Sequence, residues 1–191
     1  MNGQPAGAEN IVRDARVSDA GEIARLQVAR WRTGYAGLVP AEVLAELTSA
    51  EAEEQWRKHW VESLESPPSS RHRVMVAVGT DANGGRVVAG FAAFGPATDE
   101  DRWPATNAEL YELCVEPGQA GRGHGSRLLN AAAATLAEDG FSMACAWALE
   151  QDAAALTFLE SSGWAPDGAR KTLDMGVGVP MIRLHAALDP Q

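Results

Sequence analysis

A glycine-dense turn between an apolar strand and a long helix is the feature that most constrains the fold of this chain. Residues 118–125 read Gly-Gln-Ala-Gly-Arg-Gly-His-Gly, between a predicted strand over 108–115 and a predicted helix over 126–138. Alternating glycines let the backbone approach a ligand closely, and the start of the helix presents unpaired N–H groups and the positive end of its dipole. This combination favours an anion such as a pyrophosphate, with Arg122 adding a charge-assisted contact.

Two other phosphate-binding motifs fit this turn poorly. A Walker A loop ends in Gly-Lys-Ser or Gly-Lys-Thr, but here Ser126 directly follows Gly125 without a lysine. A dinucleotide fingerprint reads G-x-G-x-x-G after the first strand of a βαβ unit, whereas this turn reads G-x-G-x-G and follows a later strand. A tight turn without a ligand would not need alternating glycines. A nucleotide- or dinucleotide-binding protein stays open as an alternative class.

The rest of the sequence predicts a mixed α/β sheet with helices on both faces. The first half is predicted to contain a strand at Ile11 and Val12, a helix capped by Asp19 with Glu22, a short helix opening at Pro40, a helix capped by Thr48 with Glu51, and strands over 72–78 and 86–94. The second half is predicted to contain the strand, turn and helix already described, a strand over 142–148, a helix from Asp152 to Gly163 and a final strand over 181–188. Residues 1–9 are predicted to be a disordered leader and residues 10–191 a single domain.

Composition argues against several classes of function. The net charge is -10 and the pI about 4.8, whereas nucleic-acid binding needs clustered cations. Cys114 and Cys145 lie in apolar segments and are expected to be buried thiols, and the scattered histidines indicate no metal site. The N-terminus lacks the apolar core of a signal peptide, and no apolar run approaches the roughly 20 residues that span a bilayer. We therefore expect a cytoplasmic protein that binds neither nucleic acid nor membrane.

The glycine turn resembles the coenzyme A-binding motif of the GNAT (N-acetyltransferase) superfamily, usually Gln/Arg-x-x-Gly-x-Gly/Ala after a strand that ends in Val-x-Pro. Val115, Pro117, Gly123 and Gly125 match this motif. The helix from Asp152 to Trp164 is similar to the family's Asn-x-x-Ala-x-x-Phe-Tyr-Glu-x-x-Gly-Phe, and residues 31–40 are similar to a segment common in these enzymes. The resemblance implies a mixed, mostly antiparallel central sheet of six to seven strands.

The same resemblance implies that acetyl-coenzyme A is the cofactor and a primary amine of a small molecule or a protein N-terminus the acceptor, attacked directly by the amine. The implied cofactor-binding residues are Leu113, Cys114, Val115, Gln119, Ala120, Gly121, Arg122, Gly123, His124, Gly125, Ser126, Asp152, Ala155 and Phe158. Trp31 and Tyr35 are implied to line the acceptor pocket. Trp56 and Trp60, which are four residues apart, are interpreted as core. Edge strands near the C-terminus are compatible with a homodimer.

Catalysis is expected to depend on the strand over 108–115. Glu109 stands at the place of the family's glutamate and is the expected general base, on the same strand face as Tyr111, Leu113 and Val115 by simple alternation. Glu112 is then expected on the opposite face as a second candidate base. Tyr111 either lines the acceptor site or packs in the core.

Two positions depart from the family pattern. Ala120 stands where Gln or Arg is usual, with Gln119 one place early. Leu159 stands where the family has its proton-donating tyrosine, and this suggests a non-catalytic acyl-coenzyme A-binding module as the alternative function. His124 is interpreted as an exposed first-turn residue, with a substitute proton donor as the other interpretation.

Overall fold

A seven-stranded sheet in the order β1-β2-β3-β4-β5-β7-β6 forms the centre of the computed structural model, which describes residues 11–188. The strands are β1 (Ile11–Asp14), β2 (Arg73–Thr80), β3 (Arg86–Pro96), β4 (Asn107–Val115), β5 (Met143–Leu149), β6 (Ala165–Asp174) and β7 (Gly178–Ala187). All neighbouring pairs are antiparallel except β4 and β5, which are parallel. This confirms the predicted mixed, mostly antiparallel sheet. The predicted final strand is the second half of β7, which pairs with β6 as a hairpin.

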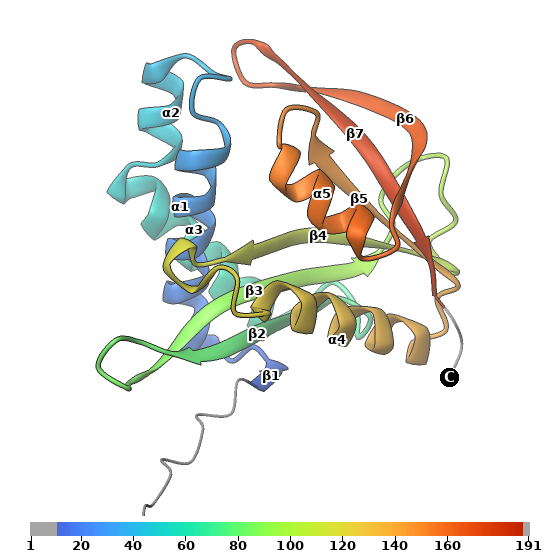
Figure 1. Cartoon of the computed structure of the whole chain (residues 1–191), viewed down its shortest axis with the longest axis horizontal. Coiled ribbons are helices and arrows are strands. Elements are labelled where there is room, and N and C mark those ends of the chain that lie inside the picture. Colours follow the sequence, from blue (N-terminus) through green and yellow to red (C-terminus); the bar gives the residue numbers. More distant parts are fainter. Residues whose placement is uncertain (1–10, 189–191) are drawn as a thin grey trace, which may run out of the picture.

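Helices cover both faces of the sheet, as predicted (Figure 1). They are α1 (Ala20–Gly34), α2 (Ala41–Leu47), α3 (Ala50–Glu65), α4 (His124–Glu138) and α5 (Ala153–Ser161). α1 and α3 pack on one face through a cluster that includes Ile23, Trp60 and Phe91. α4 and α5 pack on the other face through a cluster that includes Leu128 and Leu159. No helix within residues 11–188 is both long and apolar enough to cross a membrane.

One predicted helix cap is wrong, and another is correct in position only. Asp19 occupies the N-cap position of α1, as predicted, but its side chain makes no cap hydrogen bond. Its carboxylate instead accepts a bond from the Arg16 backbone N–H at 2.7 Å and pairs with the guanidinium of Arg13, because β1 places Arg13 beside it. The cap of α3 is Ser49 rather than Thr48, and the Ser49 hydroxyl accepts a bond from the Ala52 N–H at 3.1 Å.

The predicted cap of α5 is confirmed, and α4 begins earlier than predicted. The Asp152 carboxylate accepts a bond from the Ala155 N–H at 3.0 Å. α4 begins at His124 instead of Ser126, so the last two residues of the glycine turn belong to its first turn. The predicted leader over residues 1–9 lies outside the described residues.

Candidate active site

The parallel strands β4 and β5 separate partway along their length. They pair only from Asn107 with Met143 to Leu110 with Ala146, and beyond that point β4 continues to Val115 and β5 to Leu149 without pairing. Figure 1 shows the two strands diverging toward the glycine turn on one side and the start of α5 on the other. The sheet therefore opens between the glycine turn, which is the predicted anion site, and the beginning of α5.

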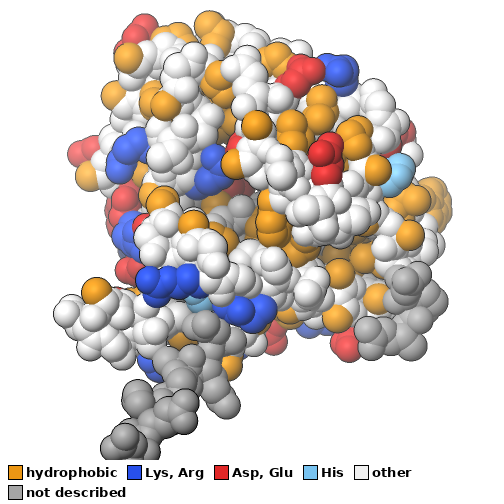
Figure 2. Space-filling model, viewed as in Figure 1, with side chains coloured by type: hydrophobic (Ala, Val, Ile, Leu, Met, Phe, Trp, Pro, Cys, Tyr) orange, Lys and Arg blue, Asp and Glu red, His pale blue; other side chains and the backbone are white. Residues whose placement is uncertain are grey.

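The glycine turn has the backbone geometry of an anion cradle. Gly121 and Gly123 have positive φ values of 73° and 77°, and Gly123 is the N-cap of α4. In the described chain, no backbone N–H from Gly121 to Ser126 donates to another backbone group. Arg122 is exposed beside them, and Figure 2 shows basic side chains gathered over this end of α4. Free N–H groups, a helix N-terminus and cations fit the pyrophosphate of coenzyme A.

Two side chains of the turn have structural roles that the sequence did not reveal. Gln119 is buried, and its Nε2 donates to the Thr80 carbonyl oxygen at 3.0 Å, so its side chain ties the turn to β2 while Ala120 is exposed. His124 is only 2% exposed and its ring lies beside Gly79 of β2. The interpretation of His124 as an exposed residue is therefore wrong, because α4 begins at this residue and directs its ring toward the sheet.

The electrostatics of His124 also weigh against a proton-donating role. Burial lowers the pKa of its imidazole below the ordinary value, and the charges of Arg127 and Arg122 lower it further. The ring is therefore neutral near pH 7. Its neighbour Ser126 is exposed on the first turn of α4.

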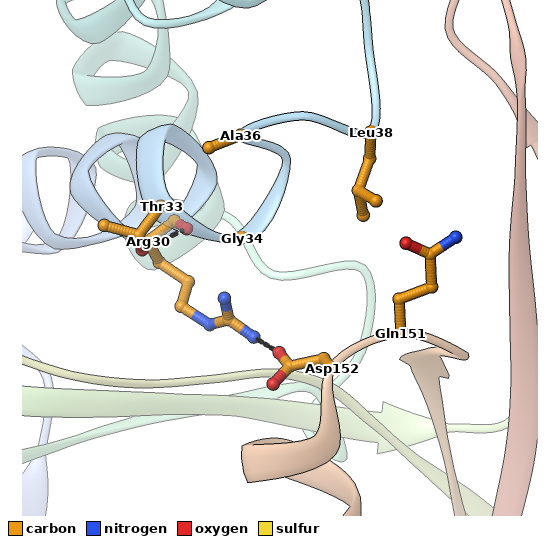
Figure 3. A pocket seen from close by; sticks show the side chains of 7 residues that line it. All are labelled: Arg30, Thr33, Gly34, Ala36, Leu38, Gln151 and Asp152. Carbon is orange, nitrogen blue, oxygen red and sulfur yellow. Dashed lines mark hydrogen bonds and ion pairs between the residues drawn. The ribbon is translucent and has the colours of Figure 1, made fainter.

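The start of α5 forms the other side of the opening. Asp152 pairs with Arg30, which reaches over from α1, as Figure 3 shows. A cavity of about 350 Å³ lies between the end of α1 and this ion pair. Figure 2 shows the surface hollowed between the N-terminal helices and α5. On the inner side, the Phe158 ring lies 3.4 Å from where a Cβ on Gly125 would stand, so glycine lets α4 and α5 approach each other.

A β-bulge at Tyr111 changes which side chains of β4 share a face. Ala93 of β3 pairs with Glu112, but Phe94 pairs with Leu110, so Tyr111 has no partner in the register. Leu110 and Leu113 pack toward α4, while Tyr111 and Cys114 pack toward α1 and α3. The predicted simple alternation is therefore wrong: Glu112 lies on the face of Tyr111 and Cys114, and Leu113 lies on the other face.

Glu109 is buried between β4 and the loop over residues 97–106. Its Oε2 accepts a bond from the Thr98 N–H at 3.1 Å and another from the Thr98 hydroxyl at 2.7 Å. Glu109 pairs in register with Cys145 of β5. Burial, followed by the charge of Glu109, raises the pKa of the Cys145 thiol to about 12.

Glu112 is half-buried and has no ion-pair partner within residues 11–188. Its carboxylate accepts a bond from the Cys114 thiol at 3.2 Å. Burial raises the pKa of Glu112 above its ordinary value, against the smaller opposing effects of the Cys114 thiol and the charge of Arg30. A carboxyl group with a raised pKa is a better proton acceptor than an ordinary one, which makes Glu112 a candidate general base.

An aromatic cavity of about 340 Å³ opens beside Glu112, between α3 and strands β2 to β4. Tyr111 contributes to its wall and stacks on His72 at 6.1 Å between ring centroids, while the Tyr111 hydroxyl donates to the Pro96 carbonyl at 2.6 Å. Trp56 and Trp60 also line the cavity, and both belong to the core cluster beneath α1 and α3, as their spacing predicts. The four-residue spacing correctly places both tryptophans on one face of α3, but it does not show what that face packs against.

The two predicted acceptor residues lie near this cavity without lining it. Trp31 packs edge-on against Trp56, with ring centroids 5.0 Å apart. Tyr35 packs with Val39 and Leu149 beside the β6–β7 hairpin. Burial raises the pKa of Tyr35, and the negative charge of Glu112 raises it further, so the phenol stays protonated.

A buried arginine that the sequence analysis missed holds the loop over residues 97–106. Arg183 of β7 is 4% exposed and pairs with Asp99 at 2.8 Å and Asp101 at 2.6 Å, both in this loop. It also pairs with Asp167 of β6 at 2.8 Å. These partners are far apart in the sequence, so only the folded sheet brings them together.

Comparisons with known proteins assign the class of this site. The sequence model described as Acetyltransferase (GNAT) family matches residues 41–164. A curated relative from Bacillus subtilis (strain 168), named uncharacterized N-acetyltransferase YuaI, is 33% identical over 141 residues, which cover 74% of this chain and 72% of that protein. The chain therefore belongs to the GNAT acetyltransferase family, and the predicted family and enzyme class are confirmed.

Solved structures agree with the fold. The chain is similar to the PaiA N-acetyltransferase from Thermoplasma acidophilum in complex with coenzyme A, with a TM-score of 0.65, 17% identity and coverage of 93% of this chain and 98% of that one. It is also similar to a Salmonella typhimurium protein solved with its cofactor acetyl-CoA, with a TM-score of 0.64, 19% identity and 96% coverage of both chains. At these identities the likeness establishes the fold. Acetyl-coenzyme A is the acyl donor of the family, so the predicted cofactor is confirmed.

Proposed function

We propose that the chain moves an acetyl group from acetyl-coenzyme A to a primary amine by direct attack, with Glu112 as general base. One observation is the main support for this proposal. The bulged strand β4 ends in the glycine turn, and the bulge also directs Glu112 toward a cavity large enough for an amine. The turn and the base therefore belong to one continuous segment, residues 107–126.

Residues of the cradle bind and orient the donor. The N–H groups from Gly121 to Ser126 and the Arg122 side chain hold the pyrophosphate, while the opening between β4 and β5 leaves the β4 backbone beyond Leu110 free of a partner on that side. Acetyl-coenzyme A supplies the thioester whose acetyl group is transferred.

Glu112 makes the amine nucleophilic. Near neutral pH a primary amine arrives as an ammonium ion, which has no free electron pair for attack. Glu112 accepts the proton, and the nitrogen lone pair then forms the new N–C bond as the C–S bond breaks. Leu159 is buried in the core at 6% exposure and donates no proton. The thiolate leaves with its electron pair and takes a proton from water, which is feasible for a thiol with a pKa of roughly 8.5. The new N–C bond leaves the nitrogen with one proton in excess, and this proton is lost to water to give the amide.

Burial of both thiols supports direct attack over an acetyl-enzyme. Cys114 and Cys145 are each 1% exposed. Burial raises the pKa of both thiols, so neither forms the thiolate that would accept an acetyl group. The absence of disulfides among the described cysteines is also in keeping with a reducing compartment, and we propose a cytoplasmic location.

The test is thiol release from acetyl-coenzyme A with a panel of primary amines. We expect steady thiol release without acetylated protein in intact-mass spectra, and a much larger loss of turnover in Glu112→Gln than in Glu109→Gln. Equal losses of turnover in the two variants would assign the general-base role to Glu109 and Glu112 together. Loss in Glu109→Gln alone would return that role to Glu109, as the sequence predicts. Binding of acetyl-coenzyme A without thiol release for any amine of the panel would favour the acyl-coenzyme A-binding module.

A further inference from the structure

The aromatic cavity beside Glu112 has a composition that selects among amines. Its wall consists mainly of rings and prolines, and Trp60 is fixed there by a bond from its Nε1 to Gln27 Oε1 at 2.8 Å. Trp56 and Tyr111 present further ring surface from α3 and β4. Rings of this kind stack on flat apolar groups and attract a nearby cation through their faces.

Glu112 on β4 is the one carboxylate among the residues that line the cavity. The one arginine of the lining, Arg73, is bound through two nitrogens to Asp139, at 2.9 and 3.0 Å. Burial lowers the pKa of the lining His72, so that ring is neutral near pH 7. The cavity therefore offers one carboxylate for a positive charge in a wall that is mostly aromatic and apolar, with Gln27, His59 and Ser63 as its other polar residues.

We infer that the acceptor is a monoamine whose amino group is joined by a short linker to an aromatic ring, with the ring between Trp56 and Tyr111 and the nitrogen at Glu112. This inference rests on the proposed function and names its substrate class. A volume of about 340 Å³ is at the small end of ligand cavities and holds one or two fused rings.

Other amine classes fit this cavity less well. A polyamine or an aminoglycoside brings further ammonium groups, and the lining has no second carboxylate to receive them. A protein N-terminus brings several peptide groups, each of which needs a hydrogen-bond partner when buried, while the wall is largely ring carbon. An unbranched alkylamine fits the volume but loses the stacking and cation–ring contacts.

Kinetics with matched amines test the inference. Phenylethylamine and tryptamine are compared with butylamine, spermidine and a tripeptide with a free N-terminus, each at saturating acetyl-coenzyme A. We expect kcat/KM for the aryl amines to exceed that for butylamine by roughly ten- to 100-fold, from the usual size of ring contacts. Spermidine or the tripeptide as the best substrate, or no advantage of the aryl amines over butylamine, would overturn the inference.

Variants connect any preference to this cavity. Trp56→Ala is expected to raise KM for the aryl amines at least tenfold, with little effect on KM for butylamine or for acetyl-coenzyme A. Trp103→Ala is the matched control, because Trp103 is 70% exposed and does not line the cavity. Ser63→Phe, at the half-buried rim on α3, narrows the cavity without removing core contacts and should show the same selective loss. A loss that is equal for all amines would refute the assignment.

Calorimetric titration of phenylethylamine without acetyl-coenzyme A separates this inference from the proposed function. Binding that Trp56→Ala weakens, in the absence of turnover with any amine, would support the amine class while refuting the transferase proposal. Turnover of other amines without measurable phenylethylamine binding or turnover would support the transferase proposal and refute the amine class.

Discussion

Replacing Gly121 by alanine isolates the backbone geometry of the cradle. Gly121 has a φ of 73°, and an added Cβ would meet no atom within 4 Å, so the substitution introduces torsional strain without a clash. Holding alanine in the left-handed region costs about 1–2 kcal/mol. For a chain of this length, that corresponds to a fall in Tm of roughly 2–8 °C. Gly118→Ala is the matched control, because it is in the same turn, is equally open and has no positive φ.

The strain at Gly121 should also weaken the binding of the acyl donor, acetyl-coenzyme A. If the turn relaxes, at least one N–H of the cradle no longer points at the pyrophosphate, and a charge-assisted hydrogen bond contributes about 1.5–3 kcal/mol. The Kd for acetyl-coenzyme A should therefore rise by roughly ten- to 100-fold. At a donor concentration about 100 times the wild-type Kd, ligand binding stabilises the wild type by about 2.7 kcal/mol. A Kd weakened about 30-fold would reduce that stabilisation to about 0.9 kcal/mol.

Thermal unfolding with and without acetyl-coenzyme A measures both effects, and calorimetry gives the Kd directly. We expect Gly118→Ala to match the wild type in Tm and in ligand-induced stabilisation. The reasoning is refuted if Gly121→Ala binds acetyl-coenzyme A as tightly as Gly118→Ala does. A variant that lost Tm yet kept full affinity would show that the N–H groups of the turn are not the phosphate ligands.

Three further substitutions test the base, the loop and the core. Glu112→Gln should lower kcat by roughly 10²- to 10⁴-fold. Because the folded-state pKa of Glu112 is raised, ionisation of Glu112 destabilises the fold. The gain in Tm of this variant over the wild type should therefore grow as pH rises from the ordinary glutamate pKa to the raised one and then level off; an equal gain at all pH values would contradict this. Arg183→Met removes the arginine partner of Asp99 and one of the two arginine partners of Asp167, and should destabilise by about 3–5 kcal/mol in urea unfolding. Arg183 lowers the pKa of Asp101 to about 2, so wild-type stability from this pair should fall as pH drops from about 4 to 2, and a variant with the same acid profile would contradict the pairing. Leu159→Ala should destabilise by roughly 2–5 kcal/mol, and wild-type stability would show that Leu159 is not a core residue.

The elements that the sequence predicted correctly depend on local signals. Asp152 caps α5 because its partner, the Ala155 N–H, is three residues away and needs no other part of the chain. Gly121 and Gly123 define the turn because few other residues adopt positive φ. Helix and strand order followed from hydrophobic periodicity of the same local kind.

The wrong predictions involve partners that the sequence places far away or leaves ambiguous. Asp19 is at the predicted N-cap position, but its side chain makes no cap bond because Arg13, on a different element, pairs with the same carboxylate. The faces of β4 were assigned by alternation, but the strand has apolar residues at positions of both parities from Leu110 to Val115, so a one-residue bulge leaves no trace in the pattern. The pairing of β4 with β3 creates the bulge, and the bulge decides on which face of the sheet Glu112 lies.

Glu112 differs from Asp19, Asp167 and Glu109 in how few partners its carboxylate has. Asp19 pairs with Arg13, Asp167 pairs with Arg183, and Glu109 accepts two bonds from Thr98. Glu112 has a single weak thiol donor and a cavity beside it. An incompletely satisfied carboxylate on a bulged strand lowers stability, since an apolar residue would pack there at less cost. Local conflicts of this kind are expected where function requires them, so the deficit itself supports Glu112 as the residue that awaits a positively charged amine.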